Sequence, residues 1–319
     1  MSEHTVRLAT TPERGRGNGT HIAWTADRRQ SAIVLEQSAP LPPTGPHTEA
    51  AEELLAIAVA AYCADRIFDR DDEPDAWTRD VHVRVPVRQP ERWNVPLLER
   101  TVSFLTGDHW RVTLRRGDPN PGLRTTTANG FTPDAAALFS GGIDSLTGTH
   151  DAVASGANVS LVSYFGDGPT GHLQDRLGAA LSNDRYRFRL STTPTATLTF
   201  PDRTMRSRSL LFLALAVLVA RCNDVDTVTM AENGFIAVNV PLHAGRVGSL
   251  STRTAHPRFV DSLNQLLDEA DVGASIANPY LTMTKGDVTD RLRTLSPDDI
   301  ATTISCAHPI GRWAGEGYR

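Results

Sequence analysis

The order of apolar and polar residues predicts an irregular arm, a helix and two strands in the N-terminal part of the chain. Residues 1–46 are largely polar and end in SAPLPPTGP, which predicts an irregular N-terminal arm. Thr48–Phe68 carries alanine, leucine and glutamate in helical order, with glutamates suited to a first helical turn. Residues 81–87 and 110–115 alternate with a period of two, as half-buried strands do, and are expected to share one sheet. Pro86 predicts an edge position for the first of these strands.

A segment rich in glycine, proline, threonine and asparagine, Gly117–Asp134, predicts a domain boundary. It separates a small α+β accessory module, residues 47–130, from a second domain, residues 131–319. Short apolar strands and helices alternate in this second domain. The strands are expected at 135–139, 159–165, 186–190 and 227–230, and the helices at 145–155, 173–181 and 209–221. The alternation predicts an α/β fold, a parallel doubly wound sheet covered by helices on both faces.

The loop after the first of these strands carries residues suited to phosphate binding. It reads Ser140, Gly141, Gly142, Ile143, Asp144 and Ser145. Ligands of doubly wound sheets bind beyond the carboxyl ends of the strands. Adjacent glycines leave N–H groups free to converge on an anion, and the following helix adds its positive N-terminal dipole. The two serine hydroxyls suit phosphate oxygens, and Asp144 suits either Mg²⁺ binding or ordering of the loop.

The simpler alternative for this loop is an ordinary Gly-Gly turn between a strand and a helix. The full pattern SGG-x-DS in this context favours a phosphate-binding loop instead. The chain has no GxxxxGK[ST] loop and no GxSxG nucleophile elbow, which argues against a P-loop NTPase and a serine hydrolase.

The composition indicates a globular protein with a small negative charge. Hydrophobic residues make up 40%, charged residues 22%, and the formal net charge is −5, which argues against a dedicated nucleic-acid binder. The longest apolar run, Leu210–Ala220, is about half of the roughly 20 residues that span a bilayer. The N-terminus does not resemble a secretory signal, and three distant cysteines make no disulfide framework. We therefore expect a cytoplasmic protein that does not insert into membranes.

Lysine is almost absent. Of the 32 Lys+Arg residues only Lys285 is a lysine, as a GC-rich coding bias would produce. Because arginine cannot replace a compact, titratable ammonium everywhere, this one lysine is a candidate functional residue. The alternative is a surface residue that escaped the bias.

The segment FSGGIDS resembles the pyrophosphate-binding loop of the PP-loop ATP pyrophosphatases, which have the adenine nucleotide α-hydrolase-like fold. This resemblance implies ATP and Mg²⁺ as cofactors. It also implies cleavage between the α and β phosphates, with a carbonyl or carboxylate activated as an adenylate and pyrophosphate released.

Four further segments resemble one branch of this family, the 7-cyano-7-deazaguanine synthases. Arg208–Leu213 is similar to their Arg-Asn-x-x-Phe-Leu helix start, with Ser209 in place of asparagine. Ser251–Arg253 with Pro257 and Phe259, Pro279–Val288 with Lys285, and Ser305–Cys306 resemble the substrate segment, the lysine segment and the start of the zinc motif. Residues 231–257 are similar to the synthase-like components of bacterial anti-phage operons. The resemblance covers about residues 132–310, and that group also carries an extra N-terminal module.

The sequence departs from the synthases at two places. No cysteine follows Cys306, so the four-cysteine zinc site of the family is incomplete and zinc is not expected in this chain. The Asp-Cys pair of the substrate segment is replaced by Ser251-Thr252. Recognition of a deazaguanine is therefore a weaker expectation than ATP binding.

Three residues are expected to act on phosphate groups as catalytic residues, namely Asp144, Lys285 and Arg208. Lys285 would bind the α-phosphate or stabilise charge that develops during attack, and Arg208 would hold a phosphate unless it is simply solvated. The loop residues Ser140, Gly141, Gly142, Ile143, Asp144 and Ser145, with Tyr164 at the end of the second strand, are expected to bind the nucleotide.

Three other residues are expected to bind the substrate. Glu232 would accept from a guanine-like N–H edge, Asn233 would contact an amide or carbonyl, and Arg253 would clamp a carboxylate. The simpler alternatives are an Asn-Gly turn with an exposed glutamate and a surface ion pair. His243 and His256 are weaker pocket candidates, since lone histidines in loops are usually solvated or capping.

The resemblance implies adenylation of 7-carboxy-7-deazaguanine or a related deazapurine carboxylate, followed by amide or nitrile formation with an amine or ammonia in anti-phage defence. Operon-encoded proteins are expected partners, a homodimer is compatible with the family, and nucleic acid is not expected as a direct ligand. A catalytically silent nucleotide-binding subunit is the alternative. A third hypothesis, tRNA thiolation or amidation, is disfavoured because thiolation usually needs paired cysteines near the site.

Overall fold

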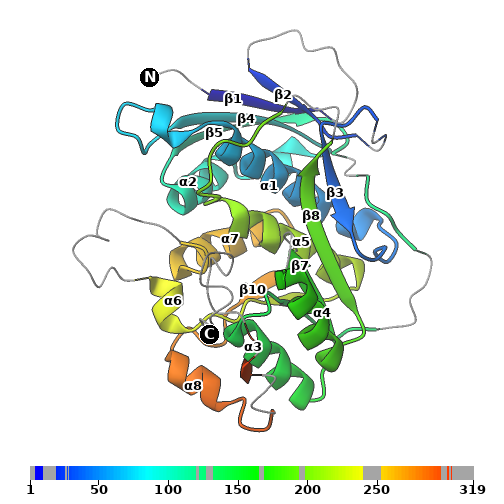
Figure 1. The fold of residues 1–319 in the computed structure, drawn as a ribbon. Helices are drawn as coiled ribbons and strands as arrows, with labels where there is room; N and C mark the ends of the chain where they lie inside the picture. The colour runs from blue at the N-terminus through cyan, green and yellow to red at the C-terminus, as the bar shows by residue number, and fades with distance from the viewer. Residues whose placement is uncertain are drawn as a thin grey trace.

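The computed structural model describes residues 4–9, 19–25, 27, 29–119, 122–126, 132–164, 169–193, 198–239, 253–295, 300–301 and 303, with residues 169 and 170 described by backbone alone. These residues form two β-sheets with helices between them and outside them (Figure 1). Among the described helices, none is both long and apolar enough to cross a membrane.

The first sheet has four strands in the order β2-β1-β4-β5, and all of its described pairs are parallel. The strands are β1 (His4–Ala9), β2 (Thr20–Ala23), β4 (Asp80–Val87) and β5 (His109–Arg116). The helices of this part are α1 (Glu49–Ile67) and α2 (Val95–Thr106), with 3-10 turns at Pro46–Thr48, Arg70–Asp72 and Pro90–Arg92. Parallel strands need a crossover connection, and α2 supplies it between β4 and β5.

The second sheet has six strands in the order β10-β9-β6-β7-β8-β3. Its strands are β3 (Ile33–Gln37), β6 (Ala135–Leu138), β7 (Val159–Tyr164), β8 (Arg185–Thr192), β9 (Thr227–Thr229) and β10 (Ser275–Ala277). All pairs are parallel except β3, which runs antiparallel to β8. The strand order reverses between β6 and β9, which makes the carboxyl ends of these two strands the expected ligand crevice.

The helices of the second part are α3 (Ile143–Ala154), α4 (Pro169–Leu181), α5 (Arg208–Cys222), α6 (Gly234–Val238), α7 (Pro257–Glu269) and α8 (Lys285–Asp290). α3 packs on β6, β7 and α4, and the usual right-handed crossover puts α3 and α4 on one face of the sheet and α5 on the other. α5 packs on β6, β7 and β9, and its opposite side packs on α1, which in turn packs on β1 and β4 (Figure 1). The predicted α/β fold with a doubly wound parallel sheet is confirmed.

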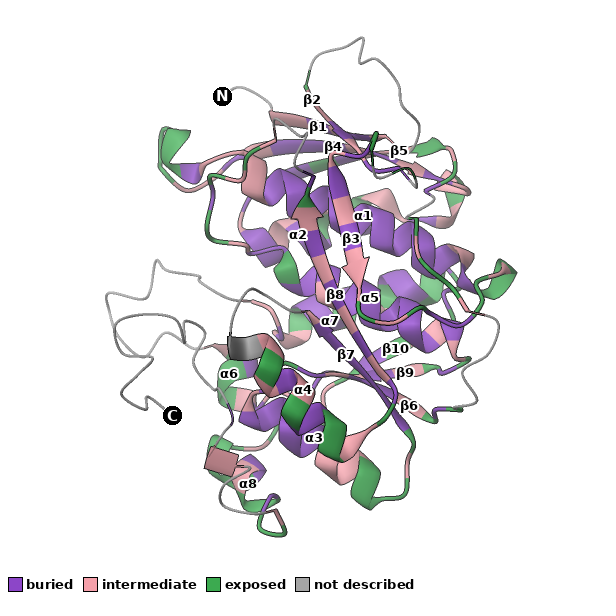
Figure 2. Cartoon of the chain, turned by 45° about the vertical axis from the view of Figure 1, so that its right-hand side comes forward, coloured by how far each residue is buried: buried purple, intermediate pink, exposed green. Residues whose placement is uncertain are grey.

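The layer between the two sheets explains the composition of α1 and α5. Both helices are buried along almost their whole length (Figure 2). A helix that is covered on all sides must be apolar all round, and the run Leu210–Ala220 meets this need in α5. One hydrophobic core cluster therefore continues from the first sheet through α1 and α5 to the second sheet.

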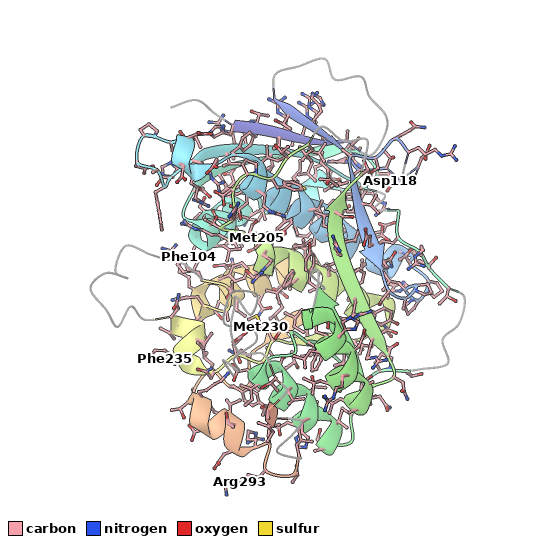
Figure 3. All side chains as sticks on the ribbon, in the orientation of Figure 1. Phe104, Asp118, Met205, Met230, Phe235 and Arg293 are labelled. Atoms are coloured by element: carbon pink, nitrogen blue, oxygen red, sulfur yellow. The ribbon has the colours of Figure 1, made fainter. Side chains whose placement is uncertain are left out.

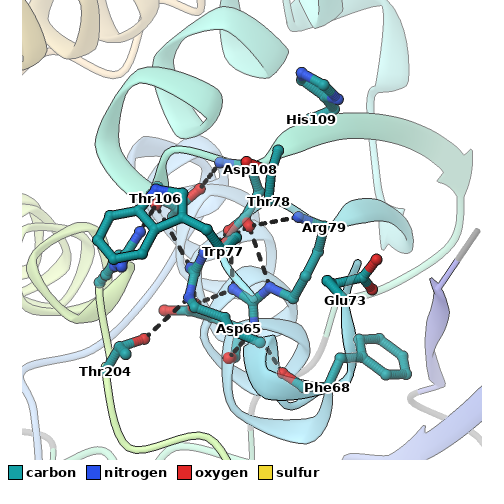
Figure 4. Close-up of polar contacts among 12 residues, drawn as sticks. Asp65, Phe68, Glu73, Trp77, Thr78, Arg79, Thr106, Asp108, His109 and Thr204 are labelled. Carbon is teal, nitrogen blue, oxygen red and sulfur yellow. Dashed lines mark hydrogen bonds and ion pairs between the residues drawn. The ribbon is translucent and has the colours of Figure 1, made fainter. Parts of the chain in front are cut away.

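A buried cluster of charged residues lies beside α1 (Figure 4). Arg70 and Arg79 each place two guanidinium nitrogens on the carboxylate of Asp108, at 2.7 and 2.7 Å and at 3.1 and 2.8 Å. Burial opposes ionisation of Asp108, but the two guanidinium groups outweigh it and hold the pKa of its carboxyl below the usual range. Such a cluster is tolerated in a core because nearly every lone pair and N–H has a partner.

Asp65, near the end of α1, extends the cluster to the start of α5. Its Oδ1 accepts from Arg79 at 2.6 Å, and its Oδ2 accepts from the backbone N–H and the hydroxyl of Ser207 at 2.7 and 2.8 Å. Ser207 is the N-cap residue of α5. The N-terminal part of the chain thus fixes the position at which α5 begins.

Two predictions for the N-terminal half are wrong. Residues 4–9, 20–23 and 33–37 are strands, so the described parts of residues 1–46 are not an irregular arm. These strands are four to six residues long and bury only alternate positions, so they depend on partners distant in sequence. β4 is also not an edge strand, because it lies between β1 and β5. Pro86 is tolerated because β1 pairs only with the part of β4 from Val81 to Arg84.

Candidate functional site

A cavity of about 200 Å³, here called the switch-point cavity, lies at the carboxyl ends of β6, β7 and β9 beside the first turn of α5. Its polar lining comprises Ser140, Ser145, Ser163, Gln174, Arg208, Ser209, Glu232 and Thr254. The remaining walls are apolar, from Leu138, Phe139, Val162, Tyr164, Phe212, Leu213, Leu215, Met230, Ala231 and Ala255. This is the crevice that the reversal of strand order predicts.

The loop after β6 forms one end of the switch-point cavity and is held by its two serines. The Ser145 hydroxyl donates to the carbonyl of Gly142 at 2.9 Å and accepts from the backbone N–H of Ser140 at 3.2 Å. The Ser140 hydroxyl accepts from the N–H of Gly142 at 3.2 Å. Gly141 adopts φ +81°, a conformation that glycine reaches without strain. The predicted loop therefore has a defined geometry, closed on itself by hydrogen bonds.

α3 begins directly behind this loop, with Gly142 as its N-cap residue. The first N–H groups of a helix have no acceptors within the helix and carry its positive dipole. The N–H of Gly142 already donates to the Ser140 hydroxyl. The N–H groups that remain for an anion are those of the first turn of α3, at the positive end of the helix dipole. An anion such as a phosphate is the ligand that this arrangement favours.

Asp144 lies in the first turn of α3 and is 7% exposed. Its Oδ2 accepts from Lys285 Nζ at 2.8 Å and from Asn233 Nδ2 at 3.1 Å. Its Oδ1 is buried without a hydrogen-bond partner. Since a buried carboxylate oxygen normally has a partner, this oxygen is a candidate ligand position.

The residues present fit a Mg²⁺ ion that arrives with phosphates. Mg²⁺ prefers oxygen ligands and is usually held by one or two carboxylates together with substrate phosphate oxygens and water. Asp144 Oδ1 is such a carboxylate oxygen, and the next residue, Ser145, lines the cavity. Among the described residues, no group of three or more His, Cys, Asp or Glu side chains could hold a metal alone. Asp144 would therefore hold the ion only in company with the nucleotide.

Lys285 reaches the loop from the first residue of α8. Its N-cap, Thr284, and Asp287 form a capping box that fixes the start of this short helix. α8 is also attached to α3, because Tyr280 Oη donates to Asp151 Oδ2 at 2.6 Å and Arg291 pairs with the same carboxylate. The Lys285 side chain is 44% exposed, so the ammonium group faces both Asp144 and solvent. The structure thus brings together two of the three predicted catalytic residues.

Glu232 lines the switch-point cavity from the end of β9. The side chain of Asn278 holds its backbone, accepting from the Glu232 N–H at 3.2 Å and donating to the Glu232 carbonyl at 2.8 Å. Burial, with a further contribution from the negative charge of Asp144, raises the pKa of the Glu232 carboxyl to about 7, although Lys285 opposes this. A carboxyl with this pKa is a proton donor or acceptor near neutral pH.

Tyr164 and Arg208 also lie at the switch-point cavity, as predicted. The Tyr164 ring stacks on Phe212 with a centroid distance of 4.7 Å, and its hydroxyl accepts from the Leu190 N–H at 3.1 Å. Burial raises the pKa of this hydroxyl. The Arg208 guanidinium lies 5.5 Å from the Phe212 centroid. An arginine that lines such a cavity suits an anionic ligand.

Two predicted substrate-binding residues have other partners. The prediction for Arg253 is wrong in its placement, because its guanidinium donates to the Phe104 carbonyl and lies 4.5 Å from the Phe104 ring centroid, in a separate groove beside α2. The cation–π contact with Phe104 holds the Arg253 guanidinium away from the position in which it would bind a substrate carboxylate. Asn233 is fully buried, and its amide caps α6 at Ile236 and donates to Asp144. It positions Asp144 and does not line the cavity.

Gln174 of α4 is a site residue that the sequence did not reveal. It lines the switch-point cavity, is 4% exposed, and its amide nitrogen donates to the carbonyls of Ser140 at 3.1 Å and Tyr164 at 3.4 Å. A Cβ on Gly141 would lie 3.4 Å from the Gln174 side chain, so the two residues are close neighbours. A lone glutamine in a helix gives no sequence signal of this kind.

Several predicted features fall outside the described residues, namely 165–168, His243, Ser251, Thr252, Ser305 and Cys306. The expectations for zinc and for the altered substrate segment therefore stay predictions. His256 is described, and its Nδ1 accepts from the Arg258 N–H at 3.1 Å as the N-cap of α7, which agrees with the capping alternative.

The sequence was also compared with known proteins. No protein-family model matches it, and no curated protein matches it significantly. The resemblance to the PP-loop enzymes therefore rests on the residues of the chain itself.

Proposed function

We propose that the chain binds MgATP at the Ser140–Ser145 loop and adenylates a carboxylate, releasing pyrophosphate. One observation carries the proposal: the buried, unpartnered Oδ1 of Asp144 lies in the first turn of α3, while Lys285 and Asn233 hold its Oδ2. A carboxylate held in this way at a helix N-terminus is suited to an ion that accompanies phosphates.

The chemistry requires stabilisation of negative charge on the departing pyrophosphate. In the adenylation, a substrate carboxylate oxygen bonds to the α-phosphorus, the bond to the β-phosphate oxygen breaks, and pyrophosphate leaves. The N–H groups of the first turn of α3 and the Lys285 ammonium provide hydrogen bonds and positive charge to the phosphates. Arg208, which also lines the cavity, would hold a second phosphate. Mg²⁺ bound with the nucleotide would supply further charge neutralisation.

The proposed carboxylate is 7-carboxy-7-deazaguanine or a related deazapurine. The apolar walls of the switch-point cavity and the nearby Glu232 carboxyl support a flat heterocycle with N–H groups. An amine or ammonia would displace AMP to give an amide, and a second activation would give a nitrile. The resemblance of residues 231–257 to synthase-like components of anti-phage operons supports a role in defence in the cytoplasm, with operon proteins as partners.

A second candidate function is a catalytically silent nucleotide-binding subunit of a defence complex. The placement of Arg253 favours it, because the predicted carboxylate clamp packs against Phe104 and not at the cavity. This candidate predicts nucleotide binding without pyrophosphate release under any substrate condition.

Pyrophosphate release from ATP and Mg²⁺, with and without 7-carboxy-7-deazaguanine and ammonium, tests the proposal. We expect release that the carboxylate stimulates and that Asp144→Ala abolishes. The matched control is Asp224→Asn, an exposed aspartate at the opposite, amino-terminal end of β9. Binding of ATP without release, also with operon partners added, would favour the silent subunit. Wild-type release by Asp144→Ala would remove the loop assignment.

A further inference from the structure

Two polar atoms of residues that line the switch-point cavity are buried and have no hydrogen-bond partner. They are Gln174 Oε1 and Ser209 Oγ. The two residues are 4% and 8% exposed, so water reaches neither side chain freely. Buried polar groups in folded proteins are nearly always hydrogen-bonded, and exceptions point to a missing ligand or solvent molecule. Asp144 Oδ1 is a third buried atom without a partner at this end of the sheet. The proposed function already assigns it to the Mg²⁺ ion that accompanies the nucleotide.

The orientation of the Gln174 amide is set by its surroundings. Its nitrogen faces the carbonyl oxygens of Ser140 and Tyr164, both of which can only accept a hydrogen bond. In the flipped orientation, the amide oxygen would face these two carbonyl oxygens, and no hydrogen bond could form. Gln174 therefore presents an acceptor, its Oε1, and has no N–H pointing the same way.

Ser209 lies in the first turn of α5, across the cavity from Gln174's helix. A serine in a helix often donates to the carbonyl four residues earlier, but the Ser209 hydroxyl makes no such bond. Its Oγ is thus available either to donate or to accept. Tyr164 and Phe212, which also line the cavity, form a stacked pair.

We propose that the switch-point cavity holds a planar purine-type base and that Gln174 reads its exocyclic amino group, with Ser209 as the second polar contact. Gln174 Oε1 accepts from the amino group, and the aromatic and aliphatic walls contact the faces of the ring. This inference rests on the proposed function in taking the cavity as the site of the nucleotide or of its deazapurine substrate. The amino group belongs either to adenine or to the 2-amino position of a guanine-type base.

The test is equilibrium binding of AMP, GMP and IMP to the full-length chain by calorimetry, at up to about 1 mM ligand, the upper end of usual enzyme affinities. IMP differs from AMP at the 6-amino group and from GMP at the 2-amino group. An unmet buried acceptor weakens binding by roughly tenfold or more, so we expect AMP or GMP to bind about tenfold more tightly than IMP. A preference for AMP assigns the adenine, and a preference for GMP assigns the guanine-type base.

Two variants locate the preference. Gln174→Met keeps the length of the side chain without its amide. We expect this variant to bind the preferred nucleotide and IMP within about twofold of each other. Ser209→Ala removes only the hydroxyl and is expected to weaken the preferred nucleotide by about threefold with an unchanged melting temperature. If Gln174→Met does not fold, the comparison of nucleotides in the wild type still tests the preference for an amino group, and Ser209→Ala still tests the second polar contact.

Equal binding of AMP, GMP and IMP by the wild-type chain would overturn the inference while leaving pyrophosphate release untouched. A preference that persists in Gln174→Met would overturn the role of Gln174. Selective AMP binding without pyrophosphate release would refute the proposed catalysis and support this inference. An absence of binding by all three nucleotides and by MgATP would refute both.

Discussion

Lys285 Nζ lies 2.8 Å from Asp144 Oδ2, although 141 positions separate the two residues in sequence. The only lysine of the chain thus reaches the first turn of the helix behind the glycine loop. The pair leaves the other oxygen of Asp144 without a hydrogen-bond partner, and its cation lies beside the first turn of α3.

Replacement of Lys285 tests whether this cation acts on the phosphates. We predict that Lys285→Met lowers pyrophosphate release by about 100-fold, as the loss of one electrostatic contact to a transition state does. The variant should also lose some stability, because the Asp144 side chain, which is 9% exposed, loses the cation that pairs with it. Arg291→Met is the matched control, since Arg291 pairs with Asp151 and its side chain is 45% exposed. Equal rates in the two variants would show that Lys285 has no role in the reaction.

The link between Asp65 and Ser207 gives a prediction for stability. Ser207→Ala removes one buried hydrogen bond, and we expect the free energy of unfolding to fall by about 1 kcal/mol. Asp65→Ala removes the carboxylate that accepts from Arg79 and from the backbone N–H and hydroxyl of Ser207, and should cost about 3–5 kcal/mol. Urea titration of both variants measures the difference. A loss of less than about 1 kcal/mol in Asp65→Ala would mean that the cluster does not hold α1 to α5.

Gly148 of α3 offers a prediction about packing beneath the site. A Cβ at this position would lie 2.5 Å from the Cβ of Ala231, the residue before Glu232. Gly148→Ala should therefore destabilise the chain by about 1–3 kcal/mol through overpacking. Gly286→Ala meets only ordinary contacts and serves as the control. Similar unfolding midpoints for the two variants would contradict the close approach of α3 to the end of β9.

Glu232 gives a prediction about pH. Its pKa is raised from 4.5 to about 7 in the folded chain, so between these values the folded state holds a proton that the unfolded state has released. The contribution of Glu232 to stability must then fall as pH rises through this window. Glu232→Gln should flatten the decline in unfolding free energy between about pH 5 and about pH 8. Parallel curves for the variant and the wild type would show that this carboxyl titrates normally.

The sequence predicted the site best where the signal is local. The strand, glycine loop and helix from Ala135 to Ala154 follow directly from residue order, and the reversal of strands then places the cavity. The strands β1, β2 and β3 were missed because four to six residues carry little pattern and their partners lie far along the chain.

Side-chain partners across the fold were harder to predict. Arg253 was expected at the substrate, but its guanidinium packs on Phe104, a contact between segments 149 positions apart. The role of Gln174 depends on two strand ends that meet only in the folded sheet. Such contacts form between segments that meet only in the folded chain. Neighbouring residues in a single sequence therefore give no sign of them.

Calorimetric binding of ATP in the presence and absence of Mg²⁺ tests the central claim most directly, because it needs no knowledge of the acceptor. We predict Mg²⁺-dependent binding that Asp144→Asn weakens at least about tenfold and Asp224→Asn leaves unchanged. ATP binding that is the same with and without Mg²⁺, and the same in Asp144→Asn, would contradict the assignment of the Ser140–Ser145 loop as the MgATP site.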